Sequence, residues 1–209
     1  RRQHQMCIRD SDKPQYTTTD DVNADAGVSS TDSKTMNENI IRARSKVDAQ
    51  ITKNAKINTE GVGVSTSDGY MIGDNGKANV LGKTTPNFRT GRSDILYSTK
   101  AASNYSILGR VMSHETAHAY SYAFGFPKLD IEKSRSFDST LNDVEHLTIR
   151  ELEYTYAAKN IVWANMKNGY TLMSDIKMTK ELLQPAQKFL YNFLYKQFSP
   201  IFNTNYLYP

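Results

Sequence analysis

The chain has little cysteine, no long apolar segment and no concentrated charge. Its 209 residues contain a single cysteine, Cys7, which excludes an internal disulfide framework. No apolar run approaches the length of about 18 residues that a membrane-spanning helix needs, so no membrane span is predicted. Lysine and arginine are scattered and leave a net charge of only +4. Because no basic run or nucleic-acid motif is present, we expect no nucleic-acid partner.

Residues 1–34 differ in composition from the rest of the chain. They contain few large apolar side chains, so they cannot offset the entropy cost of ordering, and we expect a disordered tail. Residues 1–11 resemble translated sequencing-adapter read-through, and we expect Cys7 and His4 to carry no function and the chain to be a fragment of a longer protein. Residues 35–209 are long enough to form a single domain with one core.

Histidine is scarce, and two of the four histidines lie in one short motif. The run Val111-Met-Ser-His-Glu-Thr-Ala-His-Ala-Tyr120 contains His-Glu-x-x-His. On a helix, residues four apart lie on one face, so His114 and His118 can bind one zinc ion while Glu115 reaches a water molecule. The alternative interpretation is a structural pair of buried histidines.

The motif is predicted to lie on a helix. Ser98 or Thr99 can cap a helix that begins at Lys100, and Gly125 followed by Pro127 can end it. Apolar residues at helical spacing place the two histidines on a face turned away from bulk water.

A catalytic zinc ion usually has three protein ligands, so a third donor is needed. We favour His146, on a second long helix predicted from Ser139 or Thr140 to Gly169. Carboxylates on the same helix are the alternative third ligands, namely Glu145, Glu151 and Glu153.

The motif predicts hydrolysis of a peptide bond. Zinc lowers the pKa of water, and Glu115 takes the proton as general base and returns it to the leaving amine. The oxyanion of such a reaction needs a further donor, for which the second helix offers Arg150, Tyr154 and Tyr156.

The order of the elements predicts an α+β fold, with a small mixed sheet packed on the metal-binding helix and the second helix. The elements expected besides these two helices are a helix at Met36–Ala55, a hairpin at Gly61–Gly73, a loop at Gly73–Gly91, a strand at Asp94–Tyr97 and a last helix at Met178–Phe198.

His114-Glu-Thr-Ala-His-Ala-Tyr120, followed by a histidine on a later helix, resembles the zincin superfamily and locally the SprT-like peptidases. The resemblance implies that an edge strand beside the metal-binding helix pairs with the extended substrate. The expected substrate-binding residues are those of the predicted strand: Asp94, Ile95, Leu96 and Tyr97.

The run Ser93-Asp-Ile-Leu-Tyr-Ser-Thr-Lys-Ala-Ala-Ser-Asn104 resembles carboxy-terminal metallopeptidase domains of YD-repeat (Rhs-type) polymorphic toxins, over about residues 55–170. The resemblance implies a secreted toxin domain that is released by a carrier shell, cuts a protein in a target cell and is held in check by an immunity protein. Two alternatives stay open, a catalytically silent zincin-like binding module and a housekeeping intracellular metallopeptidase.

Overall fold

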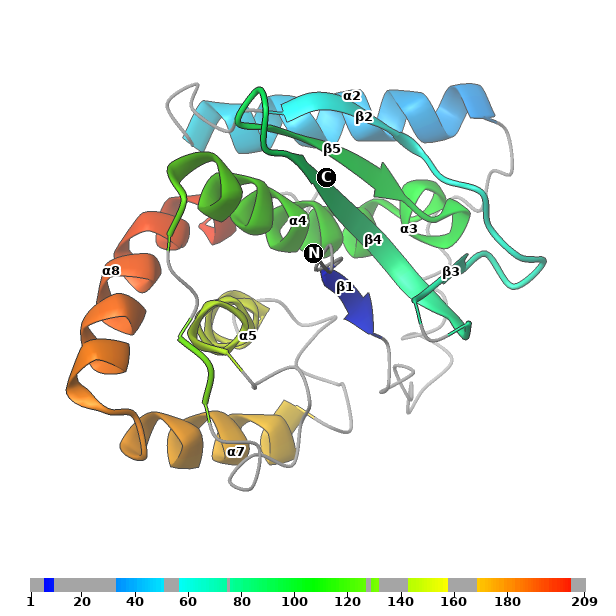
Figure 1. Cartoon of the computed structure of the whole chain (residues 1–209). Helices are drawn as coiled ribbons and strands as arrows, with labels where there is room; N and C mark the ends of the chain where they lie inside the picture. The colour runs from blue at the N-terminus through cyan, green and yellow to red at the C-terminus, as the bar shows by residue number, and fades with distance from the viewer. Residues whose placement is uncertain are drawn as a thin grey trace.

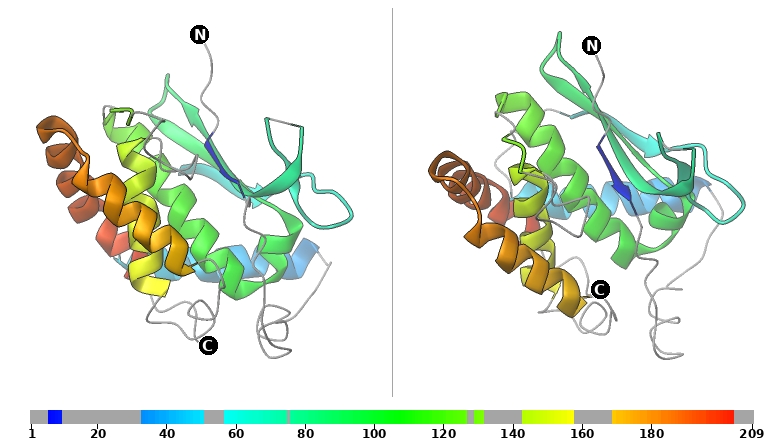
Figure 2. Two further views of the ribbon diagram at one scale, coloured as in Figure 1. Left: turned by 90° about the horizontal axis from the view of Figure 1, so that it is seen from below. Right: turned by 60° about the horizontal axis from the view of Figure 1, so that its bottom comes forward.

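A computed structural model describes residues 6–9, 33–50, 57–74, 76–126, 129–131, 143–157 and 169–203. Within these residues the helix α4 (Tyr105–Phe124) lies at the centre of the molecule. A sheet packs on one side of α4, and the helices α5 (Val144–Ala157), α7 (Gly169–Glu181) and α8 (Pro185–Phe202) lie on the other (Figures 1 and 2). The predicted α+β class is confirmed in this general form.

The sheet is mixed and has five strands. They are β1 (Met6–Arg9), β2 (Ile57–Val62), β3 (Met71–Ile72), β4 (Ala78–Asn87) and β5 (Arg92–Tyr97). The order is β1-β4-β5-β2, and β3 also pairs with β4. Strands β4 and β5 form an antiparallel hairpin, whereas β2 runs parallel to β5. Strand β4 packs directly on α4 and so brings the sheet to the histidine motif.

Two predictions about the strands are wrong. A turn does occur within the expected hairpin, with Gly69 at a φ of 82°, but its arms pair elsewhere, β2 with β5 and β3 with β4. The expected loop at Gly73–Gly91 contains the long strand β4. The sequence pattern of β4 is obscured because the polar residue Thr84 is as fully buried as the apolar residue Val80, so the strand lacks a simple alternation of apolar and polar residues.

The strand predicted at Asp94–Tyr97 is confirmed within β5, but it is not an edge strand. Strand β4 pairs with it on one side and β2 on the other. The backbone N–H and C=O groups of β5 are therefore used in hydrogen bonds to β4 and β2. The prediction that Asp94–Tyr97 pairs with an extended substrate is wrong, because this strand has no open edge. Ile95 and Tyr97 are also fully buried, while Asp94 accepts a hydrogen bond from Thr59 at 2.9 Å.

The helix predicted around the motif is present but divided. Ser98 caps α3 (Thr99–Ser103), where its side chain accepts from the Ala101 N–H. A second cap then starts α4, because the Asn104 side chain accepts from the Ile107 N–H at 3.0 Å. Helix α4 ends at Phe124, and the glycine expected at its end, Gly125, follows with a φ of 62°, a conformation that favours glycine.

The helix predicted at Met36–Ala55 corresponds to α2 (Ser33–Gln50), and residues 51–56 lie outside the described part. Its buried residues, Met36, Ile40, Ala43 and Val47, recur at helical spacing and face the core. The expected tail contributes β1 and the first residues of α2, and residues 1–5 and 10–32 are outside the described part.

The helices after the motif differ in their bounds from the prediction. Helix α5 begins at Val144, and residues 158–168 of the expected second helix lie outside the described part. The single last helix expected at Met178–Phe198 is two helices, because Pro185 at the first position of α8 starts a new helix. None of the helices within the described residues has the length and apolarity needed to cross a membrane.

Candidate metal centre

Three histidines from two helices meet in the interior. His114 and His118 lie one turn apart on α4, and His146 lies on the first turn of α5. One ring nitrogen from each lies within 4.8 Å of the others. The ring centroids are 4.8 Å apart for His114 and His118, 4.8 Å for His118 and His146, and 5.8 Å for His114 and His146. The three residues are therefore close enough to bind one metal ion.

Each of the three histidines contacts a carboxylate through its ring atom Nδ1. His114 Nδ1 lies 2.9 Å from Glu153 Oε1, and His118 Nδ1 lies 2.9 Å from Glu145 Oε1. An ionised carboxylate can only accept a hydrogen bond, so these contacts favour the tautomer in which Nδ1 carries the proton and donates, which leaves a lone pair on Nε2. Carboxylates in this position orient metal-binding imidazoles and raise their basicity.

His146 follows the same pattern through Asp143. The Asp143 side chain accepts a hydrogen bond of 2.7 Å from the His146 backbone N–H and so caps α5. Its other oxygen lies 3.1 Å from His146 Nδ1. One aspartate thus starts the helix and orients the ring at its first turn. The His146 side chain is 12% exposed, whereas His114 and His118 are fully buried.

The donor set fits a metal ion. His114 Nε2 is buried and has no hydrogen-bond partner among the described residues. A buried polar atom in that condition costs about 1–3 kcal/mol, which a bound cation would offset. Zinc bonds to imidazole are about 2.0–2.1 Å long, so nitrogens around a tetrahedral zinc ion are about 3.4 Å apart. The three ring nitrogens lie within 4.8 Å of one another, so small movements of the rings would bring them to that spacing.

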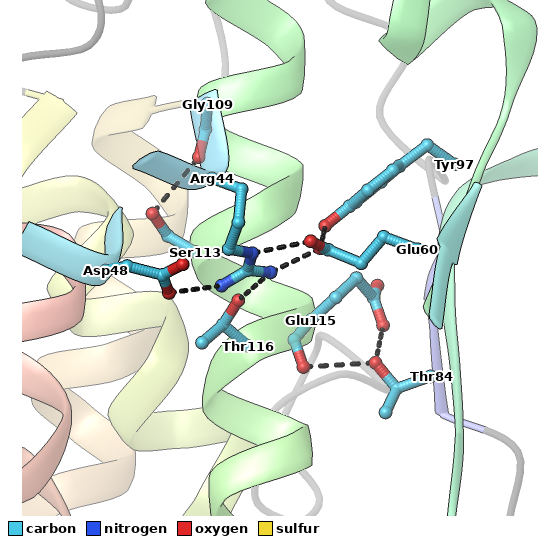
Figure 3. A network of polar contacts seen from close by, with 9 residues as sticks. All are labelled: Arg44, Asp48, Glu60, Thr84, Tyr97, Gly109, Ser113, Glu115 and Thr116. Carbon is cyan, nitrogen blue, oxygen red and sulfur yellow. Dashed lines mark hydrogen bonds and ion pairs between the residues drawn. The ribbon is translucent and has the colours of Figure 1, made fainter. Parts of the chain in front are cut away.

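Glu115 lies on α4 between the two histidines and faces β4. Thr84 Oγ1 donates to Glu115 Oε2 at 2.5 Å and also contacts the Glu115 backbone oxygen at 3.1 Å (Figure 3). The other carboxylate oxygen, Oε1, is buried without a hydrogen-bond partner among the described residues. Burial raises the pKa of Glu115 to about 8, against the lowering effect of the Thr84 hydrogen bond. A carboxyl group with such a pKa can exchange a proton near neutral pH.

Gly82 permits the close approach of β4 to this carboxylate. A Cβ atom at Gly82 would lie 2.8 Å from Glu115 Cγ and 2.4 Å from Val111 Cγ1. Both distances are shorter than real Cβ contacts, so a side chain here would push β4 and α4 apart.

Two arginines neutralise the carboxylate behind His114. Arg150 donates to Glu153 Oε2 at 2.8 Å, and Arg110 lies 3.5 Å from Oε1. Burial would raise the pKa of Glu153, but the charges of Arg150, Arg110 and His114 outweigh it and hold that pKa well below its usual range. Burial lowers the pKa of His114 well below its usual value despite Glu153, which favours a neutral imidazole able to bind a cation.

The structure places the predicted site residues in different positions. The three histidines come together as expected, and the Glu115 carboxylate contacts Thr84 on β4. Glu145 and Glu153 instead contact the Nδ1 atoms of His118 and His114. Glu151 points elsewhere, to Lys180 at 2.8 Å and to the Tyr191 hydroxyl.

None of the three expected oxyanion donors is shown at the histidine cluster within the described residues. Arg150 is engaged with Glu153 behind His114. Tyr154 is partly buried against the core, and the side chain of Tyr156 lies outside the described part.

A second, partly buried polar network connects α4 to α2 and the sheet. Arg44 on α2 donates through Nε to Glu60 on β2 at 2.5 Å and through Nη2 to Thr116 at 3.1 Å (Figure 3). The Tyr97 hydroxyl donates to Glu60 at 2.5 Å. Because Thr116 directly follows Glu115, this network fixes α4 to α2 and the sheet next to the candidate site. Asp48 adds a weaker ion pair to Arg44 at 3.7 Å.

Sequence reasoning missed three contributors: Asp143, Thr84 and Gly82. A capping aspartate three residues before His146 is a recognisable helix-start signal and could have revealed the role of Asp143. The contacts of Thr84 and Gly82 depend on the packing of β4 against α4, which no local pattern specifies.

No protein-family model matches the chain, and the comparisons with curated proteins and with solved structures also found no match. The proposed function therefore depends on the residues and geometry described above.

Proposed function

We propose that the protein is a zinc-dependent peptidase. The observation that carries this proposal is the combination of three converging histidines with a buried glutamate, Glu115, on the helix that provides two of them. His114, His118 and His146 would hold the ion. When bound, zinc would supply a Lewis acid that polarises a carbonyl group and lowers the pKa of water towards about 7.

The role of Glu115 follows from the different surroundings of its two oxygens. Thr84 holds Oε2, so the carboxylate has a fixed orientation. Oε1 can accept the proton of the attacking water and then return it to the leaving amine. Simple metal binding needs no such base, so Glu115 favours catalysis over a silent binding module.

We extend the proposal to a toxin role, as an effector domain that cuts a protein inside a target cell. The support is the resemblance of the run from Ser93 to Asn104 to toxin metallopeptidase domains. A carrier shell and an immunity protein would then be its partners. A housekeeping metallopeptidase is the competing role for the same active site.

The test measures zinc content and hydrolysis of a denatured protein for wild type, Glu115→Gln and His118→Ala. Glu115→Gln should keep the zinc and lose hydrolysis, because the amide cannot take up the proton. His118→Ala should lose both. Glu151→Gln is the matched control, since this carboxylate faces Lys180, and it should retain both. Hydrolysis that persists in Glu115→Gln would contradict the proposed mechanism.

A further inference from the structure

An exposed aromatic residue at the turn between β4 and β5 is connected to the metal centre through one intervening ring. Phe88 is 76% exposed, and its ring meets the Tyr122 ring edge-on at 6.3 Å between centroids. Tyr122 follows His118 by one turn of α4, and these two rings stack at 6.5 Å. We call Phe88, Tyr122 and His118 the aromatic row, because their rings lead from the surface to the histidine cluster.

The turn, and not burial of the ring, holds Phe88 in place. The Asn87 backbone oxygen accepts from the N–H groups of Thr90 at 3.2 Å and Gly91 at 2.9 Å. The Asn87 side chain accepts from the Arg89 N–H at 3.1 Å. Gly91 has a φ of 65°, which lets the chain turn into β5. Phe88 is therefore presented at a defined position before anything covers it, which lowers the entropy cost of binding.

The position of Phe88 indicates a binding role. A single exposed phenylalanine is common on protein surfaces and would indicate nothing alone. Here the exposed ring is continuous through Tyr122 with a ligand of the candidate metal ion. Aromatic walls beside a few convergent polar groups are the usual composition of a substrate-binding site. The ring also gains more from contact with an apolar group than from water.

We propose that Phe88 and Tyr122 form the subsite for a large apolar side chain of the peptide substrate, close to the bond that is cut. This inference rests on the proposed peptidase function and names its substrate class, peptides with leucine, methionine or an aromatic residue at one fixed position. A charged side chain there would lose hydration against two rings and is disfavoured.

The test maps the bonds cut in denatured casein by mass spectrometry for wild type, Phe88→Ser and Phe189→Ser. Phe189 on α8 is 75% exposed and provides a matched control. Wild type should show enrichment of large apolar residues at one position relative to the cut bond. Phe88→Ser should reduce that enrichment about tenfold, the scale of a lost apolar contact in substrate selection. Phe189→Ser should keep the wild-type enrichment, and Phe88→Trp should retain most of it.

The outcomes separate the subsite from the function. Cleavage with unchanged enrichment in Phe88→Ser, or with no enrichment in wild type, overturns the subsite and leaves the peptidase function standing. Loss of zinc or of thermal stability in Phe88→Ser would indicate a structural role and also overturn the subsite. Zinc-loaded wild type that cuts no bond overturns the proposed function and the subsite with it.

Discussion

Replacing Glu145 by glutamine tests whether the carboxylates behind the histidines strengthen metal binding. Glu145 Oε1 lies 2.9 Å from His118 Nδ1, and both side chains are almost fully buried. Glutamine keeps an acceptor oxygen but removes the negative charge that raises the basicity of the ring. Loss of such a partner lowers metal affinity about 10–100-fold. Because the hydrogen bond can persist, we expect the lower end, about tenfold or about 1.4 kcal/mol.

The corresponding change at Glu153 should have a second effect. Glu153→Gln also removes the charge that Arg150 faces at 2.8 Å, and the Arg150 side chain is only 7% exposed. Breaking a buried ion pair from one side costs about 3–5 kcal/mol of folding free energy. We therefore expect Glu153→Gln to weaken zinc binding and to destabilise the metal-free protein, whereas Glu145→Gln should mainly weaken binding.

The assay is a zinc titration of the metal-free protein against a chromophoric chelator, with urea unfolding of the same samples. Glu151→Gln is the control, since it changes a carboxylate of the same helix that contacts Lys180 and Tyr191. Its zinc affinity should equal that of wild type. Wild-type affinity in Glu145→Gln, or an equal loss in Glu151→Gln, would refute the reasoning.

Two further predictions concern the supports of α4. Gly82→Ala should destabilise the protein by about 1–3 kcal/mol in urea unfolding, because the added Cβ would lie 2.4 Å from Val111. Gly61→Ala, whose Cβ would meet nothing closer than 3.9 Å, should unfold like wild type, and equal losses in the two variants would contradict this account. Arg44→Met should cost up to about 3 kcal/mol, the lower end for a buried ion pair, because it leaves the mostly buried Glu60 carboxylate, 11% exposed, without its cation. Adding Glu60→Gln should restore part of that stability, and a double variant no more stable than Arg44→Met would argue against the pairing.

The sequence was sufficient to predict the centre of the candidate site. The spacing of His114 and His118 is a helical periodicity, so it determines which residues share a face without knowledge of the fold. His146 could be selected because histidine is scarce in the chain. Its capping residue, Asp143, has a local signal as well.

The surroundings of the site could not be predicted in the same way. Glu145, Glu151 and Glu153 lie on one helix and look equivalent in the sequence, yet the first and last contact histidines while Glu151 contacts Lys180. The difference depends on how α5 is rotated against α4 and α7, which is set by packing. The prediction that Asp94–Tyr97 is an edge strand was wrong for a related reason. Strand pairing is non-local, so a strand at residues 94–97 can be recognised without revealing whether it lies at an edge.

The most direct test of the central claim is the zinc content of purified wild type and His146→Ala, measured by elemental analysis with Glu151→Gln alongside. A three-histidine centre predicts about one zinc ion per chain in wild type and in Glu151→Gln, and a sharp fall in His146→Ala. Full zinc retention by His146→Ala, or wild-type protein that binds no zinc, would contradict the claim.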